Sequence, residues 1–195
     1  MTKPICILQS PLFSRSGYGE LSLDLAKCLL RMDRYDLKIV PTQWGACPTK
    51  FSINEMENQE EVELFNKILR TSQLPRQPEL FIQVSIPNEF QAPAKYNIGI
   101  TAGIETTIPR HEWIEGLNRM NVNFVTSNFT KEVFEKSIFN KQYNDGSGRV
   151  EQLKSSKPME VLFWGANTDV FKKTSEKEKR YKIKIMMTLF SHFFS

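Results

Sequence analysis

The sequence has few of the residues that build metal centres and disulfide frameworks. Its 195 residues include only two histidines and three cysteines. Two histidines are too few for a histidine-rich metal site, and the cysteines are an odd number without metal-ligand spacing. We therefore expect no metal ion and reduced thiols, as in a cytoplasmic protein. The cysteines are Cys6, Cys28 and Cys47.

Long hydrophobic runs are also missing. No apolar segment approaches the roughly 20 residues that cross a bilayer. The N-terminal stretch MTKPICILQS carries one lysine, and its apolar run is too short for a secretory signal. With 40% hydrophobic and 25% charged residues, the composition is that of an ordinary globular domain with its own core. These features again favour the cytoplasm.

An excess of positive charge is confined to the end of the chain. The net charge is +4, but seven of the 26 basic and two of the 22 acidic residues lie between 172 and 184, which leaves 19 against 20 elsewhere. A nucleic-acid-binding surface is therefore not expected. The basic stretch precedes the apolar IMMTLFSHFF, so attachment of this tail to an anionic membrane is a third, less favoured hypothesis.

Short apolar runs alternate with helical patterns along most of the chain. This alternation predicts an α/β fold, a doubly wound Rossmann-like parallel sheet with helices on both faces, followed by an irregular C-terminal tail. The predicted strands are Ile5–Leu8, Leu37–Val40, Leu80–Ile86, Tyr96–Ala102, Val122–Ser127 and Met159–Gly165. Predicted helices follow Gly19, span about Glu57–Thr71, start near Pro109 and start near Ser127, whereas Asn144–Gly148 is predicted to be an exposed loop.

The stretch SRSGYG joins the first predicted strand to its helix. Glycines let a ligand approach the backbone closely, and the helix N-terminus offers N–H groups to a phosphate or a sugar hydroxyl. Gly17, Tyr18 and Gly19 are therefore candidate binding residues. The pattern matches neither a Walker loop nor a G-x-G-x-x-G fingerprint, and a plain strand-to-helix turn is the alternative.

The stretch TAGIETTIP follows the fourth predicted strand. Its carboxylate, Glu105, is a candidate to accept hydrogen bonds from a sugar or to act as a base. The alternatives are a solvated loop acid or a cap for the helix near Pro109.

Two later segments also lie at the ends of predicted strands. In TSNFTK, Ser127 and Asn128 start a helix and are candidates for ligand contact, with simple capping as the alternative. In GANTDVF, Gly165 permits a tight turn that Asp169 can fix, and the alternative is a structural turn.

Two aromatic residues complete the candidates. Trp44 and Trp113 are suited to stacking on a sugar ring, although such side chains more often pack in a core or at its rim.

The order of these segments resembles the N-terminal half of GT-B-fold glycosyltransferases, particularly the large retaining group called family 4. The similar phrases are ILQSPLFSRSGYGELSLDLAKCL, YNIGITAGIETTIPRHEWIEGLNRM, VNFVTSNFTKEVFEKS and VLFWGANTDVFKK. Together they span about Ile5 to Lys173.

This resemblance implies a domain that mainly binds acceptor, facing a second domain that binds the nucleotide-sugar donor. It also implies transfer through an oxocarbenium-like transition state, with stabilisation of the departing diphosphate as the main electrostatic task. Gly17 and Gly19 would lie beside phosphates or acceptor, and Glu105 and Thr106 near the reacting sugar. Ser127, Asn128 and Asp169 would shape the cleft and hinge. Such enzymes need no metal, and the absence of a D-x-D phrase agrees.

Two departures from the family pattern limit what is expected. Many members place a histidine where this chain reads ITAGIETT, so that role is unfilled or passes to Glu105. The donor-side domain also has no counterpart. We expect residues 1–171 to form the acceptor-side domain and residues 172–195 a charged linker with the truncated start of the second domain. Alone, the fragment would be inactive. A non-catalytic nucleotide- or glycan-binding module is the alternative function.

Overall fold

The computed structural model describes residues 2–49, 59–71, 74–142, 148–165, 168 and 173. The chain divides into two compact units, Met1–Phe163 and Trp164–Ser195. Every helix and strand given below belongs to the first unit. The predicted tail, residues 172–195, lies outside the described residues apart from Lys173.

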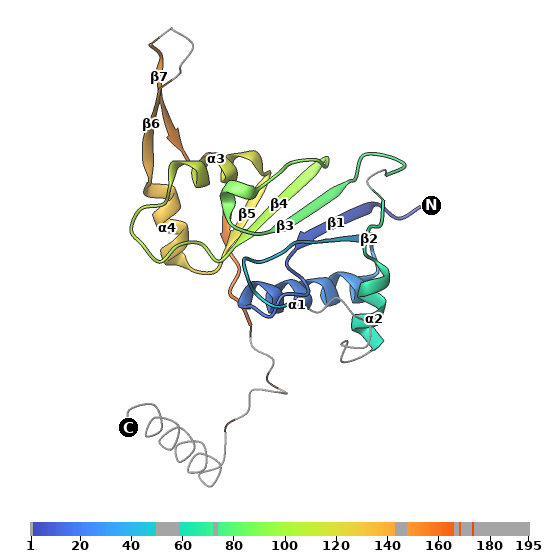
Figure 1. The fold of residues 1–195 in the computed structure, drawn as a ribbon. Helices are drawn as coiled ribbons and strands as arrows, with labels where there is room; N and C mark the ends of the chain where they lie inside the picture. The colour runs from blue at the N-terminus through green and yellow to red at the C-terminus, as the bar shows by residue number, and fades with distance from the viewer. Residues whose placement is uncertain are drawn as a thin grey trace. The chain divides into compact units, whose positions relative to one another are not determined.

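Strands and helices alternate along the first unit (Figure 1). The strands are β1 Ile5–Ser10, β2 Asp36–Pro41, β3 Leu80–Val84, β4 Tyr96–Thr101, β5 Val122–Val125, β6 Ile138–Gln142, β7 Val150–Lys154 and β8 Met159–Val161. The helices are α1 Gly17–Met32, α2 Gln59–Asn66, α3 His111–Arg119 and α4 Asn128–Lys136, with a 3-10 turn, η2, at Pro87–Glu89.

Six strands form one parallel sheet in the order β2-β1-β3-β4-β5-β8. Beyond β2, Ile68 forms a parallel bridge with Ile39. Two backbone bonds hold this bridge, from Ile39 N to Lys67 O at 3.0 Å and from Leu69 N to Ile39 O at 2.8 Å. If the bridge is counted as a rudimentary third strand, the sheet begins in the 3-2-1-4-5-6 order of the Rossmann fold. The predicted fold class is confirmed.

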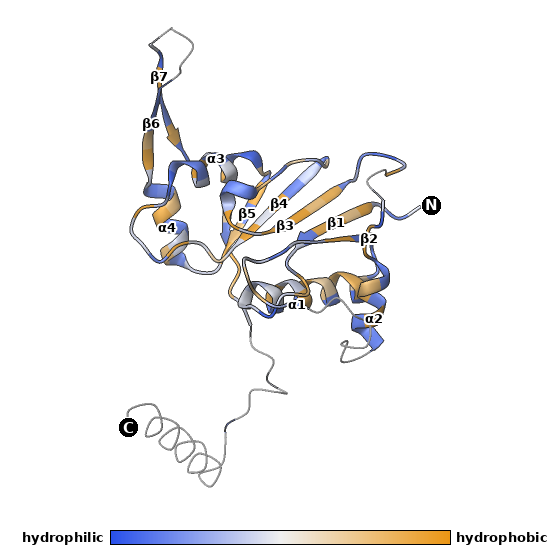
Figure 2. Ribbon diagram, in the orientation of Figure 1, coloured by the Kyte–Doolittle hydropathy of each residue, from blue (hydrophilic) through white to orange (hydrophobic). Residues whose placement is uncertain are grey.

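Each face of the sheet packs against its own helices. On one face Leu8 and Ile39 pack with Leu29 of α1 and Leu64 of α2. On the other face Ile7, Phe81 and Val125 pack with residues of α3 and α4, namely Ile114, Leu117 and Phe134. Figure 2 shows hydrophobic residues concentrated along β1 and β3, at the centre of the sheet. Strands covered on both sides need apolar residues on both faces, which explains the continuous apolar runs.

All six predicted strands are present, but several predicted boundaries were wrong. The strand predicted to run to Gly165 ends at Val161. Pro109 precedes α3 instead of beginning it, because Arg110 is the N-cap. The predicted α2 was too long at its C-terminal end, because the helix ends at Asn66 and not at Thr71. Its predicted start at Glu57 lies outside the described residues.

The antiparallel hairpin of β6 and β7 was missed (Figure 1). Most of its residues are exposed, so no apolar run marked it. Of the loop predicted at its tip, residues 144–147 lie outside the described residues, and Gly148 is exposed at a φ of +65°.

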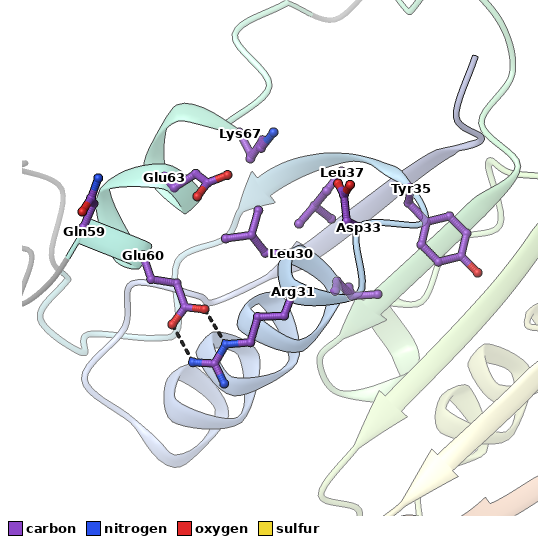
Figure 3. Close-up of a pocket in the computed structure, with 10 residues that line it drawn as sticks. Leu30, Arg31, Asp33, Tyr35, Leu37, Gln59, Glu60, Glu63 and Lys67 are labelled. Atoms are coloured by element: carbon purple, nitrogen blue, oxygen red, sulfur yellow. Dashed lines mark hydrogen bonds and ion pairs between the residues drawn. The ribbon is translucent and has the colours of Figure 1, made fainter. Parts of the chain in front are cut away.

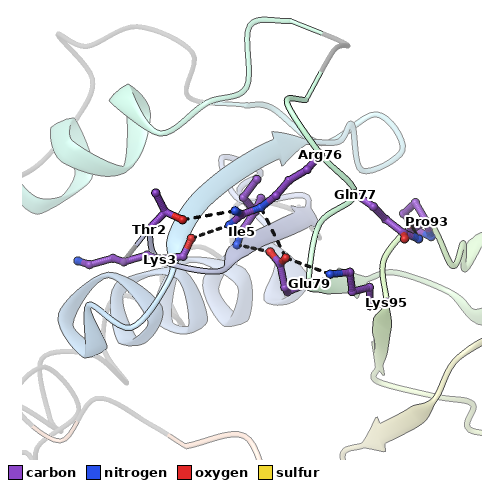
Figure 4. A network of polar contacts seen from close by, with 8 residues as sticks. All are labelled: Thr2, Lys3, Ile5, Arg76, Gln77, Glu79, Pro93 and Lys95. Atoms are coloured by element: carbon purple, nitrogen blue, oxygen red, sulfur yellow. Dashed lines mark hydrogen bonds and ion pairs between the residues drawn. The ribbon is translucent and has the colours of Figure 1, made fainter.

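At the amino edge of the sheet, Glu79 joins β1 to the segments around it (Figure 4). Its Oε2 accepts a hydrogen bond from the Ile5 backbone N–H at 2.8 Å. Its Oε1 lies 3.5 Å from the Arg76 guanidinium and 3.3 Å from Lys95 Nζ. The backbone hydrogen bond, followed by the two cations, lowers the pKa of Glu79.

We expect Glu79→Gln to destabilise the fold at pH 7 and to reduce its sensitivity to acid. Because the pKa of Glu79 is lowered in the folded chain, its stabilising effect is present above the ordinary glutamate pKa of roughly 4.3. That effect is lost as pH falls through the lowered value. Urea unfolding at pH 7 and at acidic pH measures both effects. Glu63→Gln is the control, because Glu63 is exposed and has no ion pair within the described residues.

Candidate functional site

The carboxyl edge of the sheet contains a topological switch point. The chain leaves β1 for β2 on one side, and β3 lies on the other side of β1. Loops that follow two such strands diverge and leave a crevice, where ligands of open α/β sheets bind. The candidate site is therefore built from the segments that follow β1, β2, β3, β4 and β5.

The loop after β1 is held tightly, and its two glycines differ. Ser16 is the N-cap of α1, and its side chain accepts a hydrogen bond from Gly19 N at 3.1 Å. A Cβ on Gly19 would lie 1.9 Å from Ser14 O, whereas a Cβ on Gly17 would meet nothing within 4 Å. Packing of the helix start against the loop thus explains Gly19. Gly17 is exposed, and packing does not require a glycine there.

Tyr18 connects the start of α1 to the end of β4. Its hydroxyl lies 3.2 Å from Thr101 Oγ1 and accepts a hydrogen bond from Ala102 N at 2.9 Å. Its ring stacks on Trp44 of the loop after β2, with centroids 4.1 Å apart. Burial raises the pKa of Tyr18, so the phenol stays protonated at neutral pH. Trp44, a candidate for stacking on sugar, has one ring face against Tyr18.

The same edge continues from β4 to β5 and α4. Thr126 Oγ1 donates to Ala102 O at 2.9 Å. Gly103 has a φ of +87°, and a Cβ there would lie 2.0 Å from Thr130 Cγ2. Ser127 is the N-cap of α4 and accepts a hydrogen bond from Thr130 N at 3.1 Å. The candidates after β1 and β5 therefore lie on one connected edge.

Glu105 and Thr106 occupy the exposed loop after β4. Thr106 Oγ1 donates to Ile108 O at 3.0 Å. The Glu105 carboxylate has no hydrogen bond or ion pair within the described part of the chain. Its alternative role as a helix cap is wrong, because Arg110 is the N-cap of α3. A catalytic role for Glu105 stays a prediction.

The remaining candidates are less firmly placed. Asn128 is exposed at the start of α4, and the neighbouring Phe129 is 48% exposed. Gly165 is exposed and belongs to the second compact unit. Asp169 lies outside the described residues.

The structure adds a polar pocket at the switch point that the sequence interpretation missed. Its volume is about 380 Å³, and Gln9, Thr42, Ser85, Asn88 and Glu89 line it among others. Gln9 and Gln83 are partners in the register of β1 and β3. The sequence did contain an indication of this pocket. A glutamine interrupts the apolar run near the end of each of the two predicted strands, in ICILQ and in LFIQV.

The turn η2 forms one wall of this pocket and is fixed by α3 and β3. A Cβ on Gly116 of α3 would lie 1.7 Å from Pro87 O. The Arg119 guanidinium donates to Phe90 O at 2.7 Å and to Asn88 O at 2.8 Å. Buried Gln83 donates to Glu89 O at 3.0 Å and accepts from Gln91 N at 2.8 Å. Neither end of the Gln83 amide is free, so it positions the turn.

A second pocket also has Asn88 in its lining. Its volume is about 400 Å³, and Ile86, Ile104 and Trp113 supply its apolar lining. Arg110 and Glu112, of opposite charge, and Asn88 complete it. Trp113, predicted either to stack on a sugar or to pack, is partly buried and lies against Phe134, with centroids 6.2 Å apart.

A larger hollow, of about 460 Å³, lies away from this edge, between the end of α1 and α2 (Figure 3). There the Arg31 guanidinium donates to both oxygens of Glu60, at 2.6 and 2.8 Å. Two of the charged groups that line it are thus paired with one another. It also lies at the amino edge, beside Tyr35 and Leu37, so we do not assign the site to it.

Comparison with known proteins adds no assignment, because no family model, curated protein or solved structure matches the chain. Within the described residues, no group of three His, Cys, Asp or Glu side chains is placed to hold a metal ion. In the same part of the chain, no helix is long and apolar enough to cross a membrane.

Gly19→Ala and Gly17→Ala should affect folding differently. We expect Gly19→Ala to lower the free energy of unfolding by about 1–3 kcal/mol, because its methyl group collides with the Ser14 carbonyl. Gly17→Ala should change it by less than about 1 kcal/mol, in the stabilising direction, since alanine favours helix. Denaturant unfolding measures both values. Equal destabilisation by the two substitutions would contradict this account.

Tyr18→Phe should lower the free energy of unfolding by about 1–3 kcal/mol, because it leaves the Ala102 N–H without its acceptor. Tyr35→Phe is the matched control, since the Tyr35 hydroxyl has no hydrogen bond within the described residues. Hydrogen exchange at Ala102 gives a local readout. Unchanged protection there in Tyr18→Phe would show that the hydroxyl does not hold β4.

Proposed function

We propose that this chain forms the acceptor-side domain of a nucleotide-sugar-dependent glycosyltransferase. One observation carries the proposal: a pocket at the switch point of a doubly wound sheet, lined mostly by amide and hydroxyl groups together with the Glu89 carboxylate. Amide and hydroxyl groups both donate and accept hydrogen bonds, as sugar hydroxyls do. Such a pocket suits the hydroxyl-bearing substrate, the acceptor.

The other residues of the edge fit roles around that substrate. Gly17 leaves open space at the N-terminus of α1, where a phosphate or hydroxyl can approach the backbone. Glu105 is the candidate base for the acceptor hydroxyl, and Tyr18 and Ser127 position the segments beside it. Thr106 and Asn128 are candidates for contact with the sugar. The proposal includes no metal cofactor.

The proposal requires a second domain for the donor. The described residues contain one doubly wound sheet, which supplies one wall of a cleft. Stabilisation of the departing diphosphate, the largest electrostatic task in sugar transfer, falls to the opposite wall. Gly165 and Asp169, which follow β8 in the sequence, remain candidates for the connection between the walls.

A transfer assay on the longest natural reading frame tests the function. Supplied with a panel of nucleotide-sugars and glycan acceptors, the protein should release nucleotide and extend an acceptor. Glu105→Gln should reduce turnover by about 10²-fold or more if the carboxylate is the base, with Glu63→Gln as control. Unchanged turnover in Glu105→Gln would remove Glu105 from the mechanism, and failure to use any donor would remove the transferase assignment.

One observation favours a second candidate, a non-catalytic glycan- or nucleotide-binding module. No contact within the described residues holds the Glu105 carboxylate in place, whereas a catalytic group is normally positioned by supporting contacts. Ligand binding without turnover in the longest reading frame would establish this module.

A further inference from the structure

We propose that the two pockets that share Asn88 bind one molecule, a neutral glycoside with an apolar ring as its aglycone. This inference rests on the proposed function and names the acceptor class for the same site. The sugar lies in the switch-point pocket, lined by Gln9 and Thr42. The aglycone lies in the second pocket, against Trp113.

Charge decides which substrate the switch-point pocket prefers. No lysine, arginine or histidine is among the described residues that line it, while Glu89 contributes a carboxylate. Glu89 accepts a hydrogen bond from Ser85, and no described cation is paired with it. A phosphate or carboxylate would be repelled there without compensation. A neutral polyhydroxyl ring avoids that cost.

The hydrogen-bonding groups needed by such a ring are available. The side chains of Gln9 and Thr42 have no hydrogen-bond partner within the described part of the chain. Gln9 offers a carbonyl oxygen and an NH₂ group, and Thr42 offers a hydroxyl. Water satisfies these groups in the free chain, and the hydroxyls of a matching ligand can replace that water.

The second pocket has a different chemical character. Ile86, Ile104 and Trp113 present apolar surface, and the indole is suited to an apolar ring through offset or edge contacts. Arg110 and Glu112 carry opposite charges, so the pocket as a whole attracts neither an anion nor a cation strongly. It therefore selects for apolar surface.

The shared residue makes a single ligand the simplest occupant. Asn88 lines both pockets. Its backbone carbonyl accepts a hydrogen bond from Arg119 of α3, which holds the turn in place. The two volumes, about 380 and 400 Å³, together fall within the range of about 300–1,000 Å³ typical of small-molecule sites. A fixed turn between a polar and an apolar hollow matches a ligand whose two halves differ in the same way.

Nuclear magnetic resonance on the 195-residue chain tests the proposal. The ligands are phenyl and methyl glycosides of glucose, galactose and mannose, together with phenol. For at least one sugar, the phenyl glycoside should bind at least tenfold more tightly than the methyl glycoside. Only the phenyl compounds should shift the Trp113 indole N–H, and phenyl glycoside should displace both methyl glycoside and phenol.

Three variants locate the binding. Gln9→Leu should weaken both glycosides several-fold, Ile104→Ser should weaken the phenyl glycoside alone, and Gln59→Leu, in the hollow of Figure 3, should change neither. Unfolding curves confirm that each variant folds.

If no sugar shows a gain in affinity from the phenyl group, or if phenol and phenyl glycoside bind at the same time, the inference is overturned. If the longest reading frame transfers sugar but glycosides do not bind, this inference alone is contradicted. If glycosides bind but no transfer occurs, only the transferase assignment is contradicted.

Discussion

The hydroxyl of Tyr18 is the contact on which the shape of the carboxyl edge depends. β1 and β4 are separated by β3 in the sheet, so the loop after β1 and the loop after β4 have no ladder bonds in common. Tyr18 spans that gap by bonding Thr101 and the Ala102 N–H. Its ring also fixes Trp44. Through Ala102 and Thr126 the constraint reaches the start of α4, so one phenol coordinates four loops.

Much of the sheet could be predicted from the sequence because strands covered on both faces must be apolar throughout. ICIL, and LFIQV with its single glutamine, were predicted to be strands for this reason. Elements whose stability comes from tertiary contact could not be predicted. The turn η2 exists because Gly116 and Arg119 meet it from a helix distant in sequence, and the β6–β7 hairpin is mostly exposed and lacks an apolar pattern.

The candidate site divides in the same way. Ser127 was predicted as a helix cap from local sequence rules, and the structure has it as the N-cap of α4. Gly19 was singled out as a candidate binding residue, and in the structure the close Ser14 carbonyl requires a glycine there. The pocket at the switch point depends on the register of β1 and β3, which places Gln9 beside Gln83. Register is a property of pairing between strands, and no single segment encodes it. The family resemblance, and the chemistry that it implies, remain a proposal.

Two carboxylates at this edge, Glu89 and Glu105, differ in how firmly they are held. The difference bears on which of them suits substrate binding and which suits a chemical step. One oxygen of Glu89 accepts a hydrogen bond from Ser85, within a turn whose backbone Gln83 and Arg119 hold. Glu105 is exposed, and nothing in the described chain directs it. A base must lie within hydrogen-bond reach of the proton that it removes. Under the proposed function, Glu89 is therefore the better placed of the two to bind substrate, whereas Glu105 would need a contact from bound substrate or from a second domain before it could act.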